Sequence, residues 1–172
     1  MRVIDLSATI EQGMKIYPND PEVQIEVVHT HEQNGWELRK LSLGSHTGTH
    51  VDSFSHMVSH GKSLDQLPIS RFFGEAVIVD IHRQFPRQIG LFFIEHIGLE
   101  LAERIIDAEP RFVGGNIDEA LQRALLQAGI ITYTDLINLE EIPIGKPFTF
   151  YGLPLKIKDG DGSPIRAIAI FD

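Results

Sequence analysis

The chain has 172 residues, of which 42% are hydrophobic and 23% are charged, and its formal net charge is −9. A chain of this size can bury a sizeable core, and we expect a single domain over residues 1–172. The acidic balance argues against a nucleic-acid binder, which needs a basic face, and against binding to an anionic membrane surface. The lack of cysteine excludes disulfides, thiolate zinc sites and cysteine nucleophiles.

No segment resembles a targeting or membrane-spanning sequence. The N-terminal residues, MRVIDLSATIEQGMKIY, lack the long apolar stretch of a signal peptide. No apolar run approaches the roughly 20 residues that cross a bilayer. We therefore expect a cytoplasmic protein.

The first half of the chain predicts strands. Residues 2–10, RVIDLSATI, are expected to form the first. Residues 23–29 alternate between apolar and polar side chains, and residues 37–43 are their expected partner across a turn near Asn34–Gly35. The continuous apolar run 76–81 predicts a buried strand.

The second half predicts two helices among further strands. Residues 99–108, LELAERIIDA, have apolar side chains at helical spacing. In residues 116–129, Asn116 is the expected N-cap, Glu119 completes a capping box, and Gly129 is the expected C-terminal cap. Strands are expected at the segments 111–115, 130–134 and within 148–171. Together these elements predict a mixed α/β fold with two helices and much antiparallel pairing.

Residues 45–57, SHTGTHVDSFSHM, concentrate groups that bind metals. His46, His50, Asp52 and His56 all occupy even positions, so an extended chain presents them on one face. The β-branched residues between them favour that extended state. A surface feature or a chance cluster is the alternative interpretation. The remaining histidines are scattered, and we expect each to lie on the surface or to be a hydrogen-bonded structural histidine: His29, His31, His60, His82 and His96.

Distance limits how these four residues can share an ion. At about 3.3 Å per residue, a straight strand separates His46 from His56 by roughly 33 Å. His46 can join His50 and Asp52 only if the chain bends, and Gly48 is the residue that allows a bend. His56 is then expected on the far side of Asp52.

These limits give a metal hypothesis. His46, His50 and Asp52 are expected to hold one divalent ion, either zinc or manganese. Asp52 has a second oxygen that could bridge to another ion. His56 would be either a ligand of that second ion or a general base, and a bound ion would activate water and polarise a carbonyl.

The same stretch resembles the H-x-G-T-H-x-D-x-P-x-H signature of the cyclase family, which includes bacterial kynurenine formamidases and isatin hydrolases. Four further segments also resemble the family: DLSATIEQGMKIYPNDP, GKSLDQLPISRFFGEAVIVDI, LINLEEIP and LPLKIKDGDGSPIRAIA. The resemblance implies a swivelling β/β/α domain, a metal-dependent amidohydrolase acting on a small molecule, and a homodimer or homotetramer.

Carried over by position, the resemblance makes His46, His50 and Asp52 the ligands of one metal. Asp52 would bridge two ions in a dinuclear member. His56 would ligate the second ion there, and would transfer protons in a mononuclear member.

The sequence also departs from the family pattern. Phe54 replaces the proline of the signature. Gln122 and Thr134 replace the histidine and the glutamate that complete the second metal site in dinuclear members, so the resemblance implies one ion here. The chain is also short for a member of the cyclase family, and we expect that a strand bearing a Thr-Gly element is missing after IVDIHRQFPRQIG.

Three functions remain open from the sequence. The first is a mononuclear hydrolase of an aryl formamide or cyclic amide, with His56 as the catalytic base and Phe54 and Trp36 as candidate apolar contacts to the substrate. The second is a degenerate member that binds metal or a small ligand without turnover. The third is a purely structural metal, whose removal would lower stability.

Overall fold

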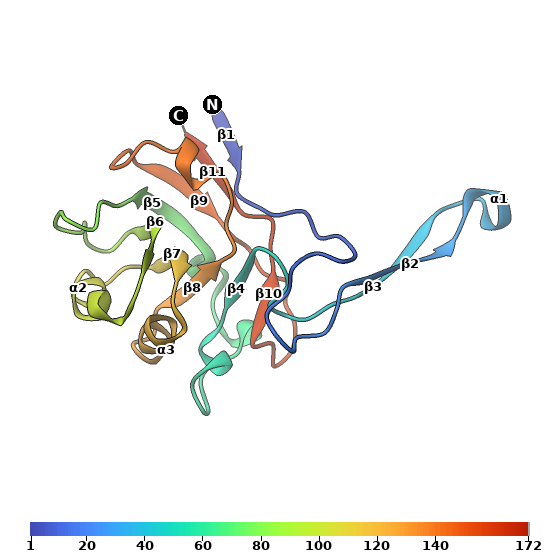
Figure 1. Cartoon of the computed structure of the whole chain (residues 1–172), viewed down its shortest axis with the longest axis horizontal. Coiled ribbons are helices and arrows are strands. Elements are labelled where there is room, and N and C mark those ends of the chain that lie inside the picture. The colour runs from blue at the N-terminus through green and yellow to red at the C-terminus, as the bar shows by residue number, and fades with distance from the viewer. Residues whose placement is uncertain (172) are drawn as a thin grey trace.

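A computed structural model describes residues 1–171 (Figure 1). Its centre is a nine-stranded sheet with the order β1-β11-β9-β5-β6-β7-β8-β4-β10, beside a separate two-stranded hairpin, β2-β3. The strands are β1 (Arg2–Asp5), β2 (Gln24–His29), β3 (Leu38–Ser42), β4 (His50–Asp52), β5 (Phe73–Ile78), β6 (Gly90–Ile97), β7 (Phe112–Ile117), β8 (Ile131–Thr134), β9 (Phe148–Tyr151), β10 (Gly162–Pro164) and β11 (Ile168–Phe171). The α-helices are α1 (His31–Asn34), α2 (Ala102–Asp107) and α3 (Glu119–Gln127), and short 3₁₀ helices are η1 (Phe54–His56), η2 (Leu64–Gln66), η3 (Ile69–Phe72), η4 (Leu99–Leu101) and η5 (Leu139–Glu141).

The middle of the sheet is parallel and both of its sides are antiparallel. Strands β5, β6, β7 and β8 run parallel, whereas β9, β11 and β1 on one side and β4 and β10 on the other pair antiparallel. The expected mixed α/β fold is therefore confirmed. Strand β1 ends at Asp5, earlier than the expected residue 10.

The expectation of a missing strand after residue 90 is wrong. Gly90–Ile97 forms β6, the longest strand, between β5 and β7. Its first four residues are buried, but Ile94, Glu95 and His96 are exposed and the register shifts between Phe93 and Ile97. Because this pattern is neither alternating nor continuously apolar, the periodicity of the sequence does not predict the strand.

Helices α2 and α3 lie side by side and cover one face of the sheet (Figure 1). The N-cap of α3 is Asp118, whose side chain accepts a hydrogen bond from the Leu121 amide at 2.7 Å, and not Asn116 as expected. Asn116 still belongs to β7, so the helix begins later. Gly129 adopts the left-handed conformation expected of a C-terminal cap, with φ +79°.

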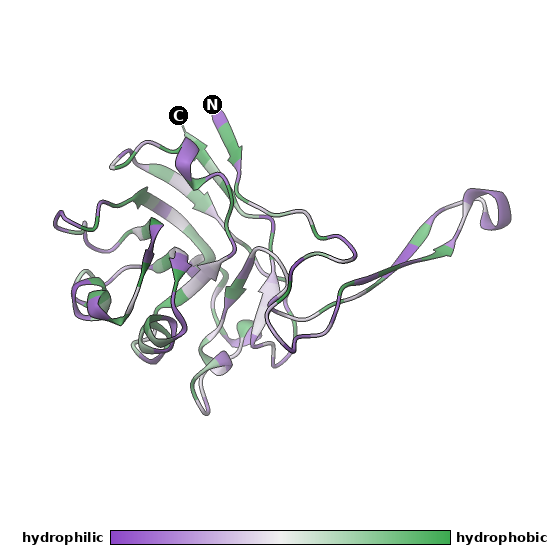
Figure 2. Cartoon of the chain, viewed as in Figure 1, coloured by the Kyte–Doolittle hydropathy of each residue, from purple (hydrophilic) through white to green (hydrophobic). Residues whose placement is uncertain are grey.

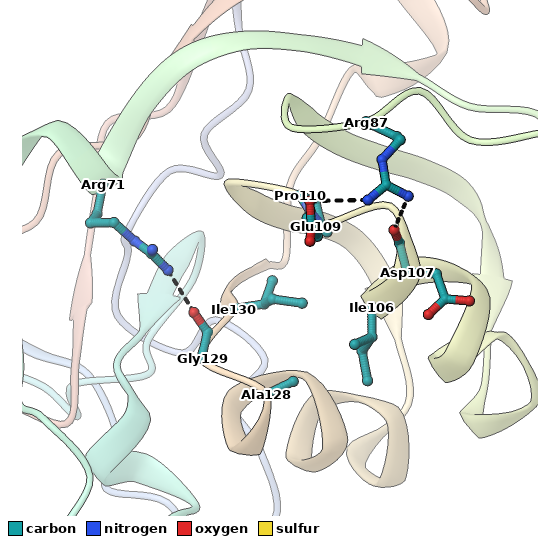
Figure 3. A pocket seen from close by; sticks show the side chains of 9 residues that line it. All are labelled: Arg71, Arg87, Ile106, Asp107, Glu109, Pro110, Ala128, Gly129 and Ile130. Carbon is teal, nitrogen blue, oxygen red and sulfur yellow. Dashed lines mark hydrogen bonds and ion pairs between the residues drawn. The ribbon is translucent and has the colours of Figure 1, made fainter.

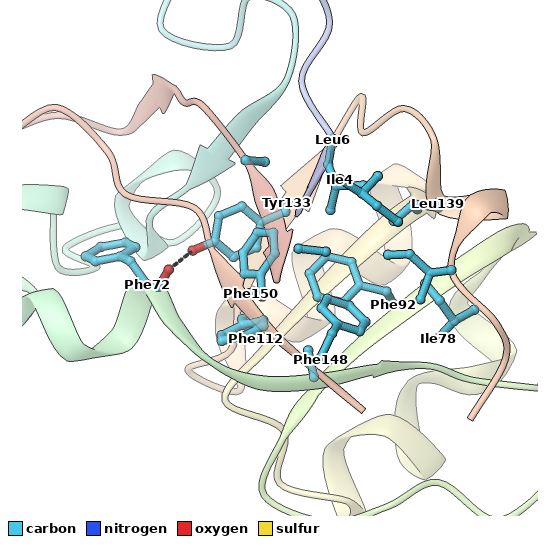
Figure 4. Packing of buried hydrophobic residues seen from close by; sticks show 14 of the residues in the cluster. Ile4, Leu6, Phe72, Ile78, Phe92, Phe112, Tyr133, Leu139, Phe148 and Phe150 are labelled. Carbon is cyan, nitrogen blue, oxygen red and sulfur yellow. Dashed lines mark hydrogen bonds between the residues drawn. The ribbon is translucent and has the colours of Figure 1, made fainter. Parts of the chain in front are cut away.

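An aromatic core fills the other face of the sheet (Figure 4). The ring of Phe92 lies 4.7 Å from that of Phe150, and Phe150 lies 4.8 Å from Tyr133. The Tyr133 hydroxyl is fully buried and lies within hydrogen-bonding distance of the carbonyls of Phe72 and Gly152. Truncating one such ring costs about 3–5 kcal/mol, so this layer holds the sheet that carries the site.

The hairpin β2-β3 projects from the body as an arm (Figure 1). The expected turn near Asn34–Gly35 is confirmed, with the one-turn helix α1 built into it and Gly35 at φ +78°. No residue of β2 or β3 is buried, and apolar segments of the arm are left uncovered (Figure 2). Among the described residues, no helix is long and apolar enough to cross a membrane.

Candidate metal centre

The histidine-rich stretch runs through β4, which lies between β8 and β10. Gly48 has φ +61°, so the chain turns sharply just before the strand, as expected. After the three residues of β4, the 3₁₀ helix η1 turns the chain back. The ring of His46 therefore lies 5.0 Å from that of His50 and 3.9 Å from that of His56, centroid to centroid.

Three of the four predicted residues converge closely. His46, Asp52 and His56 each offer a ligand atom, and these atoms lie within 4.8 Å of one another. The expected position of His56, on the far side of Asp52, is wrong. The expectation assumed an extended chain beyond Asp52, whereas η1 brings residue 56 back beside His46.

His50 lies at the edge of this cluster. Its Nε2 is 3.3 Å from Asp52 Oδ1, while its Nδ1 donates a hydrogen bond to the Gly48 carbonyl at 2.7 Å. Because a carbonyl can only accept, Nδ1 carries a proton, so Nε2 is the nitrogen that faces an ion at Asp52 when the ring is neutral. A backbone carbonyl that fixes the ring in this way is typical of histidine ligands.

The two family departures lie directly at this cluster. Gln122 Nε2 donates to Asp52 Oδ2 at 2.6 Å, and the Thr134 hydroxyl is 2.9 Å from His50 Nε2. The strand register pairs His50 with Thr134. Neighbouring Asp135 has φ +54°, and its Oδ2 reaches 4.0 Å from His50 Nδ1.

Asp161 belongs to the site and was missed by the sequence reasoning. Its Oδ2 is 2.9 Å from His46 Nε2 and 3.7 Å from His56 Nδ1. It comes just before β10, where Gly162 pairs with Asp52. It lies in the sequence DGDGSP (residues 159–164), which contains two carboxylates and is part of the segment LPLKIKDGDGSPIRAIA that resembles the family.

Paired charges shift the pKa values of the cluster. Burial disfavours the charged form of His46, but hydrogen bonds to Asp52 and Asp161 outweigh it and raise its pKa to about 9. The pKa of Asp52 is lowered, because hydrogen bonds from His46 and His50 outweigh its burial. Burial, followed by the positive charge of His46, lowers the pKa of His56. His56 is therefore neutral near pH 7, the state that accepts a proton.

The two candidate apolar contacts lie in different places. Phe54 is part of η1, packs against the aromatic core, and lies under the Arg71 guanidinium at 6.0 Å. Trp36 lies on the arm, half exposed, with its ring 4.3 Å from that of His29. The arm points away from β4, so Trp36 is not at the site of its own chain (Figure 1).

Two surface cavities differ in their relation to the cluster. A cavity of about 630 Å³ lies beyond the C-terminal ends of α2 and α3, where Arg71 and Arg87 donate to the carbonyls of Gly129 and Asp107 (Figure 3), and none of the predicted site residues lines it. A cavity of about 430 Å³ lies at the carboxyl ends of β6, β7 and β8. Its lining includes Thr134 and Asp135, the two residues beside His50, so it adjoins the cluster.

Known proteins resemble this chain along almost its whole length. The family model described as "Putative cyclase" matches residues 4–112. The kynurenine formamidase of Salinibacter ruber is 29% identical over 211 residues, which cover 98% of this chain and 97% of that protein. The kynurenine formamidase of Bacillus cytotoxicus is 27% identical, and the alignment covers 96% of this chain and 95% of that protein. The first alignment is longer than this chain, so that relative has residues without a counterpart here.

Solved structures share the fold. Isatin hydrolase A from Labrenzia aggregata, bound to benzyl benzoate, superimposes with a TM-score of 0.81 at 21% identity, over 98% of this chain and 93% of that one. A structure described as a potential metal-dependent hydrolase with cyclase activity superimposes with a TM-score of 0.79 at 24% identity. The match covers 98% of this chain and 96% of that one. Because the family model covers more than half of the sequence, and the relatives match it almost from end to end, the chain belongs to the cyclase family.

Proposed function

We propose that this protein is a hydrolase of a small amide, an aryl formamide or a cyclic amide, that uses one divalent ion held by His46, His50 and Asp52. The observation that carries the proposal is the convergence of imidazole and carboxylate groups around Asp52. This donor set suits zinc or manganese. The names of the relatives, kynurenine formamidase and isatin hydrolase, agree with an amide substrate.

A divalent ion at this place supplies Lewis-acid chemistry, lowering the pKa of water and polarising a carbonyl. The chain supplies proton transfer. Neutral His56, with Nδ1 at 3.7 Å from Asp161 Oδ2, takes the proton of the attacking water and returns it to the leaving nitrogen. The carboxylate of Asp161 stabilises the imidazolium that forms in between.

The substrate would approach from the side of Thr134. The cavity of about 430 Å³ that adjoins His50 is large enough for a single aromatic ring system. Apolar side chains such as Phe93 and Leu136 line it together with polar ones such as Asn116 and Glu140. Phe54 remains a candidate contact on the side of η1.

The test combines metal content with turnover. Purified protein is expected to contain about one equivalent of zinc or manganese by elemental analysis and to hydrolyse N-formylkynurenine or isatin. His50→Ala is expected to lose both. No metal in the wild-type protein would refute the proposal, and so would two equivalents.

A degenerate binder is the second candidate, and one observation favours it. Gln122 and Thr134 already form hydrogen bonds with Asp52 and His50, so the cluster is satisfied without substrate. This candidate predicts one bound ion and no turnover across amides, esters and lactones. A purely structural role for the ion predicts the same metal content and lack of turnover, together with a large loss of thermal stability when the metal is removed.

We also propose a homodimer or homotetramer held together through the arm. A two-stranded hairpin is marginally stable alone in water. This one exposes Val27, Val28, Trp36, Leu38 and Leu41, which a second copy would cover. A cytoplasmic location stays a prediction from the sequence.

A further inference from the structure

Two hydrogen-bond donors outside the histidine stretch hold one carboxylate oxygen of Asp52. Its Oδ2 accepts hydrogen bonds from Gln122 Nε2 at 2.6 Å and from the Thr132 hydroxyl at 2.9 Å. Asp52 and Thr132 are fully buried and Gln122 is 9% exposed. The opposite oxygen, Oδ1, faces His46 at 2.8 Å and His50 at 3.3 Å.

The two donors come from rigid elements. Thr132 lies directly across the β4-β8 ladder from Asp52. Gln122 lies in α3, whose start is fixed by the Asp118 cap and whose apolar face packs on the sheet through Leu121 and Leu125. The contact therefore depends on secondary structure and not on a flexible loop.

The occupancy of Oδ2 has a chemical consequence. A carboxylate oxygen has two lone pairs, and two donors use both. An aspartate that bridges two ions through both oxygens offers one oxygen to each, whereas here Oδ2 is held by Gln122 and Thr132 and only Oδ1 faces the proposed ligands His46 and His50. We propose that Gln122 and Thr132 are positioning residues that aim Oδ1 at a single ion and withhold Oδ2 from a second.

This inference rests on the metal site of the proposed function, but not on turnover. The experiment is calorimetric titration of metal-free protein with Zn²⁺ and Mn²⁺. Thr132→Val and Gln122→Met are expected to keep one ion per chain and to weaken its binding by about 10–100-fold, as is typical when an outer-shell partner is lost. Thr132→Ser keeps the hydroxyl and should restore affinity to within about 3-fold. Gln127→Met, the same change at an exposed position of α3, should have no effect.

Gln122→Glu tests the stoichiometry. It replaces a donor with a carboxylate beside Oδ2, so the capacity should rise to two ions per chain, the second bound more weakly. Unchanged affinity in Thr132→Val and Gln122→Met, a second ion in the wild-type protein, or a capacity of one in Gln122→Glu would each overturn the inference. A wild-type protein that binds one ion but hydrolyses nothing would refute the proposed hydrolase and leave this inference standing. A wild-type protein that binds no ion would overturn both.

Discussion

The rings of His46 and His56 lie 3.9 Å apart, and Asp161 Oδ2 lies within 3.7 Å of a nitrogen of each. One carboxylate thus contacts two histidines whose pKa values are shifted in opposite directions. The opposite pKa shifts suggest different roles for the two rings. His46, which is held by two carboxylates, would bind the ion, and His56, which is neutral, would exchange protons.

His56→Ala should lower turnover by about 100-fold or more, the usual contribution of a general base, while metal content stays at one equivalent. His82→Ala removes an exposed histidine and should change neither quantity. Loss of the ion from His56→Ala would instead make His56 a ligand, an arrangement that the distances within the cluster also allow.

Gly48→Ala should weaken metal binding. The left-handed backbone at φ +61° costs an alanine about 1–2 kcal/mol, and relief of that strain would move His46 away from His50. Gly35→Ala is the matched control, since Gly35 has φ +78° in open space at the tip of the arm. Both variants should lose stability in chemical denaturation, but only Gly48→Ala should lose metal affinity. Equal metal affinity in the two would show that the turn at Gly48 does not shape the site.

Local sequence patterns predicted some parts of this site and could not predict others. The bend at Gly48 was predictable because a distance limit demanded it. The return of the chain at η1 was not, because a single turn of 3₁₀ helix has no periodic signal, and so His56 was misplaced. Asp161 was missed for a different reason. Asp161 lies just before β10, and the strand that pairs with β10 is β4, more than a hundred residues earlier in the chain. Only the pairing of β10 with β4 brings Asp161 to the histidines.

The fold shows the same division. Strands and helices with a clear period, such as α3 and the β2-β3 hairpin, were predicted from the sequence. Strand β6 was not, since three exposed residues and a register shift interrupt its apolar run. The position of Gln122 at Asp52 was visible only as a departure from a family pattern, and its contact needed the structure.

Metal binding should strengthen as the pH rises. The pKa of His46 is raised from 6.5 to about 9 in the metal-free protein, so below pH 9 an ion must displace a proton. Apparent affinity should rise by at least about tenfold per pH unit as the pH approaches 9 and then level off, with at least one proton released per ion, because the pKa of His50 is raised as well. Calorimetry in buffers of different ionisation enthalpy measures that release, and an affinity independent of pH over this range would contradict the prediction.

The same shift has the opposite effect on the metal-free fold. A pKa raised on folding stabilises the folded state fully below about pH 6.5 and loses that contribution as the pH rises through about 9. Denaturation of the metal-free protein should therefore show stability falling over this window. His46→Gln should reduce the fall, and an unchanged fall would assign the effect to another group, such as His50, whose pKa is also raised.

Leu41→Lys should shift the protein towards monomer. Leu41 is 60% exposed on the arm, where a charge would oppose burial in an interface. Ile144→Lys is the control, because Ile144 is 61% exposed on the body of the protein. Light scattering coupled to size-exclusion chromatography measures the mass. A wild-type protein that is already monomeric, or an assembly that Leu41→Lys leaves intact, would exclude the arm as the interface.

Gly162→Ala should weaken metal binding by filling the space that the His46 ring occupies. A Cβ at residue 162 would overlap His46 Cε1 and come within 2.8 Å of Nδ1. The ring has little freedom to move, because Asp52 and Asp161 hold its two nitrogens. Gly44→Ala is the control, since a Cβ there meets only ordinary contacts of 3.4 Å or more. We expect metal affinity to fall by tenfold or more in Gly162→Ala and to stay unchanged in Gly44→Ala. Wild-type affinity in Gly162→Ala would mean that the position of His46 does not matter for the ion, and would remove it from the ligand set.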